Sequence, residues 1–220
     1  MAAPVTALDP ARFPDPGLAA ALLPHAFDRR DGAHDEGHLW RVWRSAARIA
    51  AAEGGDLRIL QAAALLHDCV NLPKTAPGRH LASRQAAARA RGLLAAIGWD
   101  APAIDAVAHA IEAHSFSAGI PPGTLEAAIL RDADRLDALG FIGVARCFHV
   151  AGQGGRAIAH PDDPAATRRP LDDTAFALDH FATKLMGLAG GMLTATGRAM
   201  AAERAARLEH FRAILLDELS

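Results

Sequence analysis

The chain of 220 residues contains no tyrosine, and aromatic residues make up only 5% of it. Strands favour aromatic and β-branched residues, whereas alanine and leucine, which supply much of the 51% hydrophobic content, are strong helix formers. We therefore expect an all-α fold, a single compact helical bundle with about nine helices. The chain is long enough to bury a core without disulfide bonds.

Cysteine is also scarce, and neither Cys69 nor Cys147 belongs to a CxxC pair. This argues against a disulfide framework or a zinc finger and favours reduced thiols in the cytoplasm. The 23 basic and 25 acidic residues lack the basic excess of a nucleic-acid binder. No apolar run reaches the roughly 18 residues of a membrane span, and residues 1–17 lack the apolar segment of a signal peptide. We expect a cytoplasmic monomer or homodimer that binds neither nucleic acid polymers nor membranes.

Helical periodicity and turn residues divide the chain into an N-terminal extension, residues 1–16, and one helical domain, residues 17–220. The expected helices cover about 17–27, 35–53, 56–69, 83–97, 101–114, 124–139, 141–151, 171–188 and 192–219. Residues 152–170 have the least periodicity. They form either a lid or a long loop on the surface.

A histidine–aspartate pair, His67-Asp68, ends the apolar run 59–66. A second pair, His34-Asp35, stands where a helix is expected to begin, and Asp35 is a suitable N-cap there. The dipeptide alone is weak evidence, because a chain of this composition contains such pairs by chance. The position of His67-Asp68 at the end of a buried helix distinguishes it from the other pair.

Helical periodicity places polar residues on three apolar faces. The faces are His38 with Val42, Ala46 and Ile49; His67 or Asp68 with Leu57, Leu60 and Ala64; and Asp132 with Leu125, Ile129 and Leu136. Buried carboxylates need partners, so either each polar residue is satisfied separately as a core or cap residue, or all share one divalent cation. We favour the shared ion. Nitrogen and oxygen ligands suit Mn²⁺, Mg²⁺, Fe²⁺, Co²⁺ or Ni²⁺ better than structural zinc.

Three motifs resemble the HD-domain metal-dependent phosphohydrolase superfamily, particularly its small bacterial YedJ/YpgQ-like branch. They are His38-x-x-Arg41-Val42, Leu65-Leu66-His67-Asp68 and Asp132-Ala133-Asp134-Arg135-Leu136-Asp137, with supporting stretches at 114–117, 137–146 and 180–185. The resemblance covers about residues 18–218. It implies an all-helical fold, metal ligands at His38, His67, Asp68 and Asp132, and hydrolysis of a phosphate ester or anhydride. Nucleoside-triphosphate pyrophosphohydrolase activity is the best precedent in that branch.

Two-metal members of the superfamily carry further histidines between the His-Asp pair and the last aspartate. This interval contains His80, His109 and His114. His109 and His114 are about 140° apart around a helix, so both cannot face one site. His114 shares the inward face of Ile111, which leaves two interpretations: a phosphate ligand or proton donor, or a core histidine at a helix end. We therefore expect one metal ion.

The proline-rich loop 71–79 follows the metal pair and carries Lys74 and Arg79, which either clamp substrate phosphates or are solvated loop charges. Arg135 either holds a phosphate at the rim of the site or pairs with Asp134. Catalysis is assigned to Asp68, Lys74 and His114, with Asp68 orienting the attacking water or accepting its proton.

The predicted function is hydrolysis of a phosphorylated small molecule, most consistent with a nucleotide, by metal-activated water. The alternatives are a nucleotide phosphomonoesterase or phosphodiesterase and a non-catalytic nucleotide or metal sensor. A di-iron oxygenase requires a second set of inward-facing ligands, which the sequence does not show.

Overall fold

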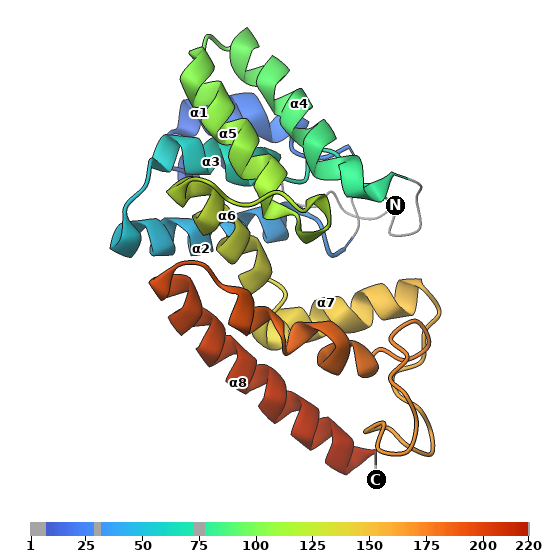
Figure 1. Ribbon diagram of the computed structural model, residues 1–220. Helices are drawn as coiled ribbons and strands as arrows, with labels where there is room; N and C mark the ends of the chain where they lie inside the picture. The colour runs from blue at the N-terminus through green and yellow to red at the C-terminus, as the bar shows by residue number, and fades with distance from the viewer. Residues whose placement is uncertain (1–7, 29–31, 73–77, 220) are drawn as a thin grey trace. The chain divides into compact units, whose positions relative to one another are not determined.

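The computed structural model describes residues 8–28, 32–72 and 78–219, and within these ranges it contains helices and turns but no β-strand. The α-helices are α1 (Pro16–Leu22), α2 (Glu36–Glu53), α3 (Leu57–Leu66), α4 (Ala82–Ala96), α5 (Ala101–His114), α6 (Leu125–Leu136), α7 (Gly140–Gln153) and α8 (Ala195–Glu218) (Figure 1). The all-α prediction is confirmed. Among the described residues, no helix has the length and apolar character needed to cross a membrane.

The chain divides into two compact units, Met1–Asp134 and Arg135–Ser220. The described part of the expected N-terminal extension packs within the first unit. The buried ring of Phe13 lies against the rings of Trp40 and Trp43, at centroid distances of 5.5 and 5.9 Å. The expectation of one domain over residues 17–220 remains a prediction.

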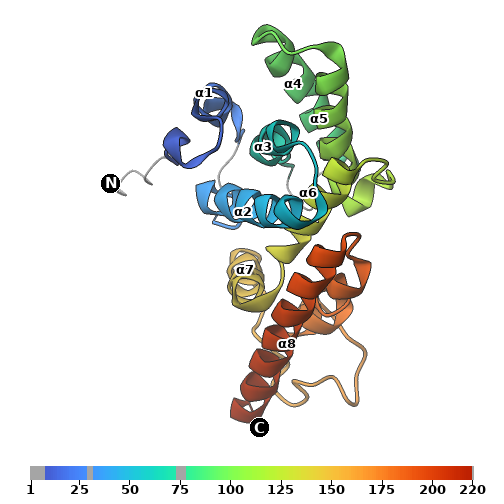
Figure 2. The same ribbon diagram turned by 90° about the vertical axis from the view of Figure 1, so that its left-hand side faces the viewer.

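Helix α3 is the central element of the first unit, where it contacts α1, α2 and α5 (Figure 2). Every residue from Leu60 to Leu66 is buried, as expected for a helix that is almost entirely apolar. The one polar residue in that run, Gln61, exchanges two hydrogen bonds with the backbone of Asp15. The chain therefore leaves α3 in the interior of the unit, where His67 and Asp68 follow.

Aspartate side chains set the start of several helices in the first unit. Asp35 accepts a hydrogen bond from the backbone N–H of His38, and Asp56 accepts from those of Arg58 and Ile59. Asp35 was expected to be an N-cap, and this prediction is confirmed. The cap at Asp35 also fixes His38 in the first turn of α2.

In the second unit, α7 packs against α8, and the segment between them differs from the prediction. A helix was expected over 171–188, but residues 171–178 form turns, and the helical part is a short segment that ends in the π-helix Phe181–Leu185. The Asp172 carboxylate accepts hydrogen bonds from the backbone of Thr174 and Ala175. Such local bonds from an aspartate side chain compete with helix formation, so the predicted helix is wrong for a physical reason.

Buried carboxylates hold the irregular segment of the second unit in place. The Asp163 side chain is 7% exposed and accepts hydrogen bonds from the backbone N–H groups of Thr167 and Arg168. Arg169 forms a bidentate salt bridge with Asp179, with nitrogen–oxygen distances of 2.6 and 2.8 Å. These bonds make residues 163–179 a defined turn structure within the unit.

Replacing Asp163 with asparagine is expected to loosen this segment, because an amide NH₂ would face a backbone donor. The hydrogen bonds from Thr167 and Arg168 lower the pKa of Asp163 from 3.8 to about 2. A depressed pKa means that the carboxylate stabilises the fold above about pH 4 and loses this effect as pH falls toward 2. Hydrogen exchange at the Thr167 and Arg168 amides should be roughly tenfold faster in Asp163→Asn at neutral pH. Unchanged exchange in the variant would show that the carboxylate does not hold the turn.

Candidate metal centre

The end of α3 presents His67 in a fixed orientation. The last carbonyls of a helix have no partner within it, and the Nδ1 atom of His67 lies 2.9 Å from the carbonyl oxygen of Ala64. A carbonyl only accepts hydrogen bonds, so Nδ1 carries the proton and Nε2 keeps its lone pair. His67 is 1% exposed, and this lone pair is directed at the other members of the site.

The end of α5 repeats this arrangement with His114. Its Nδ1 atom lies 2.6 Å from the carbonyl oxygen of Ile111, again a helix-terminal acceptor. The imidazole rings of His114 and His67 are 5.1 Å apart between centroids, and His114 Nε2 lies 3.8 Å from Asp68 Oδ1. Of the three later histidines considered from the sequence, His114 is the one that the structure places beside the metal pair.

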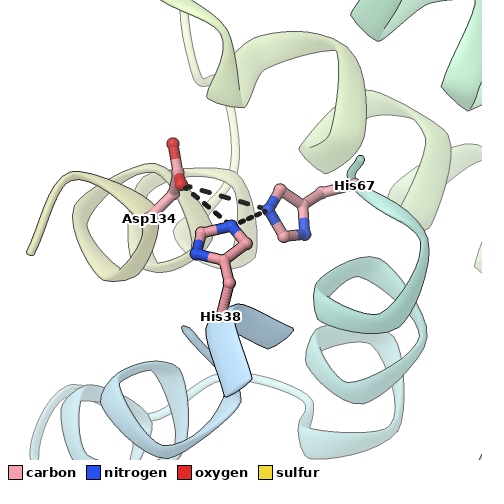
Figure 3. Close-up of side chains that lie close together, drawn as sticks. All are labelled: His38, His67 and Asp134. Atoms are coloured by element: carbon pink, nitrogen blue, oxygen red, sulfur yellow. Dashed lines mark hydrogen bonds and ion pairs between the residues drawn. The ribbon is translucent and has the colours of Figure 1, made fainter. Parts of the chain in front are cut away.

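Three potential ligand atoms converge from α2, the end of α3 and α6, and Asp68 lies beside the two histidines among them. His38 Nε2 and His67 Nε2 lie 3.2 Å apart, and Asp134 Oδ1 lies 3.7 and 4.0 Å from them (Figure 3). Asp68 Oδ2 lies 3.7 Å from His38 Nε2 and 3.6 Å from His67 Nε2. Two ligands that are each about 2.1 Å from one ion lie between about 3 and 4.2 Å apart, so these distances fit a shared divalent cation.

The protonation states also suit a cation. Burial lowers the pKa of His67, so its imidazole is neutral, as a metal ligand must be. Burial alone would raise the pKa of Asp68, but the neighbouring His67, a hydrogen bond from His38 and the nearby His114 hold it well below its usual value. The site therefore offers a neutral imidazole at His67 and an ionised carboxylate at Asp68.

The aspartate contributed by α6 differs from the expected one. Asp132 was expected beside the histidines, but the group that includes His38 and His67 contains Asp134, with its ligand atoms all within 4.8 Å of one another. Residues two apart point about 200° apart around a helix, so the two aspartates face opposite ways. Asp132 is 0% exposed on the apolar face of α6, whereas the Asp134 side chain is 29% exposed at its edge.

The other residues expected at the substrate have different positions. Lys74 lies outside the described residues. Arg79 Nη1 donates a hydrogen bond to the carbonyl oxygen of Leu72, and Arg135 Nη1 donates to that of Gly191 at 2.7 Å. The substrate-binding roles of Lys74, Arg79 and Arg135 remain predictions.

Two further histidines of the first unit, His34 and His109, have contacts of their own. The ring of His34 lies 5.7 Å from that of His38, although the sequence suggested only a capping function for its neighbour Asp35. His109 Nε2 accepts a hydrogen bond from the backbone N–H of Gly123, which ties α5 to the following loop. His109 therefore has a structural contact away from the metal pair.

Comparison with known proteins agrees with this geometry. The HD domain family model matches residues 36–139. The uncharacterized protein YpgQ of Bacillus subtilis is 34% identical over 177 residues, which cover 78% of this chain and 77% of YpgQ. The crystal structure of YpgQ in complex with ADP has 29% identity and a TM-score of 0.67, and the match covers 92% of this chain and 96% of that chain.

A structure described as an HD-superfamily hydrolase, from Bacillus thuringiensis, has 29% identity and a TM-score of 0.70, with the same coverage of 92% and 96%. The structural matches extend beyond the motif region and cover 92% of this chain. The chain therefore belongs to the HD-domain family and is a hydrolase of the HD superfamily.

Proposed function

We propose that this protein hydrolyses nucleoside triphosphates to a nucleoside monophosphate and pyrophosphate with the help of one divalent ion. The observation that carries the proposal is the convergence of His38, His67 and Asp134, with ligand atoms all within 4.8 Å of one another, together with the position of Asp68 Oδ2 beside both histidines. Both carboxylates are partly exposed, at 22% and 29%, so a substrate can approach the same ion. The complex of the relative YpgQ with ADP supports a nucleotide as the substrate.

The ligand set determines which ion fits. Two imidazole nitrogens and two carboxylate oxygens leave open positions in an octahedral shell, which favours Mn²⁺, Mg²⁺, Fe²⁺, Co²⁺ or Ni²⁺. When bound, such an ion lowers the pKa of a coordinated water and polarises a phosphoryl oxygen. We assign Asp134, in place of Asp132, as the ligand from α6 because its carboxylate is the one grouped with the histidines.

The two carboxylate oxygens of Asp68 face different groups, one toward the proposed ion and one toward the attacking water. Its Oδ2 atom lies beside His38 and His67, whereas its Oδ1 atom lies beside His114. In the proposed reaction the oxygen of water attacks the α-phosphorus, and the bond from that phosphorus to the bridging oxygen breaks. The pyrophosphate leaves with the bonding electron pair. Asp68 Oδ1 orients the water and accepts its proton.

His114 is placed to act on the phosphates. With its Nδ1 proton donated to Ile111, the neutral ring can only accept a hydrogen bond at Nε2. An imidazolium at this position would donate from Nε2, which lies 3.8 Å from Asp68 Oδ1, to a phosphate oxygen or to the departing pyrophosphate. Lys74 and Arg79 on the loop after Asp68 would hold the remaining phosphate oxygens.

The His114→Ala variant is expected to reduce kcat on the order of a hundredfold while leaving the metal content unchanged. The matched control is His109→Ala, because His109 lies on the same helix but bonds to Gly123. Its kcat should stay near the wild-type value. Equal losses in the two variants would indicate a general disturbance of α5 and would remove the chemical role of His114.

The reaction itself is tested by measuring pyrophosphate and orthophosphate separately. The substrates are nucleoside triphosphates, nucleoside monophosphates and phosphodiesters, each with Mn²⁺, Mg²⁺, Co²⁺ or Ni²⁺. We expect pyrophosphate from triphosphates and its loss after chelation. Orthophosphate from monophosphates would favour the phosphomonoesterase alternative, and cleavage of diesters would favour a phosphodiesterase. Absence of turnover with every ion would favour the sensor.

A further inference from the structure

The backbone that carries Asp68 lies just past the end of a helix. Helix α3 ends at Leu66, and residues 67–70 form turns and bends, whereas His38 and Asp134 lie within α2 and α6. A carboxylate that binds an ion and orients a water has to be held within about half an ångström of its working position. Side chains that fix the backbone after Asp68 therefore bear directly on the metal centre.

One turn of α4 holds Cys69, the residue that follows Asp68. Arg89 Nη1 donates a hydrogen bond to the carbonyl oxygen of Cys69 at 2.9 Å, and the Cys69 thiol donates to the carbonyl oxygen of Ala86, with the sulfur 3.6 Å from it. Ala86 and Arg89 are three residues apart, so they lie on the same face of α4. Cys69 is fully buried, and its carbonyl needs a donor from the protein in place of water.

A second contact holds the same segment two residues further on. The Asp28 carboxylate accepts a hydrogen bond from the backbone N–H of Asn71, with its oxygens 3.2 and 3.3 Å from the nitrogen. This bond is long and exposed to solvent, whereas the bond from Arg89 is shorter, partly buried and donated by a charged group. Arg89 is therefore the side chain whose loss should disturb the segment most.

We infer that Arg89 is a positioning residue that keeps Asp68 in place through the backbone of Cys69. The inference rests on the proposed function, which assigns Asp68 Oδ2 to the ion and Oδ1 to the water. A planar peptide group joins Asp68 to Cys69, so their Cα atoms are about 3.8 Å apart and a shift of one residue moves the other. Without Arg89 the buried carbonyl would lose its donor, and the turn would rearrange. Groups behind metal ligands orient those ligands in this way.

The test compares two substitutions that keep the aliphatic part of the Arg89 side chain. Arg89→Met removes the donor and should weaken Mn²⁺ binding roughly tenfold and lower kcat at saturating Mn²⁺ by a similar factor. Arg89→Lys keeps a charged donor for the single hydrogen bond and should hold the Mn²⁺ affinity within about threefold of the wild-type value. The KM for the nucleotide should change by less than about twofold in both, because Arg89 is assigned no contact with the phosphates.

The matched control is Arg91→Met, because Arg91 lies on the same helix but pairs with Asp105 at the surface. Its Mn²⁺ affinity and kcat should equal those of the wild type. Titration of Mn²⁺ into metal-free protein measures the affinity without any turnover. The visible absorption spectrum of the Co²⁺-loaded protein reports the ligand geometry, and it should change in Arg89→Met but not in Arg89→Lys or Arg91→Met.

The outcomes separate this inference from the proposed function. Unchanged Mn²⁺ affinity in Arg89→Met would overturn the inference, and so would equal losses in Arg89→Lys or in Arg91→Met, because packing of α4 would then be responsible. A higher KM with kcat unchanged would assign Arg89 to the substrate and also overturn it. The expected Mn²⁺ affinities without any nucleotide turnover would support the inference and overturn the proposed hydrolysis. Failure of the wild type to bind Mn²⁺ would overturn both.

Discussion

The His67→Ala variant is expected to lose its divalent ion and to reduce kcat for nucleoside triphosphates by on the order of a thousandfold. His67 Nε2 lies within 3.2–4.0 Å of one atom from each of His38, Asp68 and Asp134, so its removal opens the cluster on every side. The metal content after exchange into buffer with limiting Mn²⁺ and the turnover rate are the measurements.

The His80→Ala variant is the control for this experiment. His80 is an exposed histidine of the same unit and was one of the residues considered for a second metal. The control should retain the metal content and kcat of the wild type. Because a ligand that binds only the folded state raises Tm, Mn²⁺ should raise Tm for the wild type and His80→Ala but not for His67→Ala. A Mn²⁺-dependent rise in Tm in the His67 variant would contradict the assignment.

Replacing each of the two aspartates of α6 with asparagine should have different effects on Mn²⁺ affinity and on Tm. The Asp134→Asn variant is expected to weaken Mn²⁺ binding roughly a hundredfold, because an amide oxygen is a much poorer ligand than a carboxylate. The expected turnover falls with the metal content and recovers partly at high Mn²⁺ concentration. Titration of Mn²⁺ into metal-free protein measures the affinity directly.

The Asp132→Asn variant is the matched partner, since it makes the same chemical change two residues away. Asp132 is fully buried, so its replacement should lower Tm by disturbing the core while Mn²⁺ affinity stays within about threefold. A loss of Mn²⁺ affinity in Asp132→Asn with normal affinity in Asp134→Asn would restore the ligand set expected from the sequence.

Helical periodicity favours Asp132 as the ligand from α6, whereas the structure groups Asp134 with His38 and His67. Periodicity selects the residues that share the most buried face, and Asp132 does lie on that face. The ion in a catalytic site must be reachable by substrate, so some of its ligands lie at the edge of the apolar face. The partial exposure of Asp68 and Asp134 reflects this requirement. The sequence signal was the position of Asp134 within the same acidic motif.

Hydrogen bonds over a few residues could be predicted from the sequence, whereas features that depend on other contacts could not. The caps at Asp35 and Asp56 were predictable because an N-cap acts on residues two or three positions away. The segment 171–188 has helix-compatible spacing, but bonds from Asp172 to the local backbone favour turns. The position of His114 beside His67 depends on how α5 packs against α3, which is a tertiary contact.

The most direct test is a crystal of the wild-type protein grown with Mn²⁺ and measured at the manganese absorption edge. We predict one anomalous peak bound by His38 Nε2, His67 Nε2 and carboxylate oxygens of Asp68 and Asp134, each about 2.1–2.2 Å from the ion. Absence of a peak between these side chains at saturating Mn²⁺, or a peak bound by Asp132 in place of Asp134, would contradict the metal centre described above.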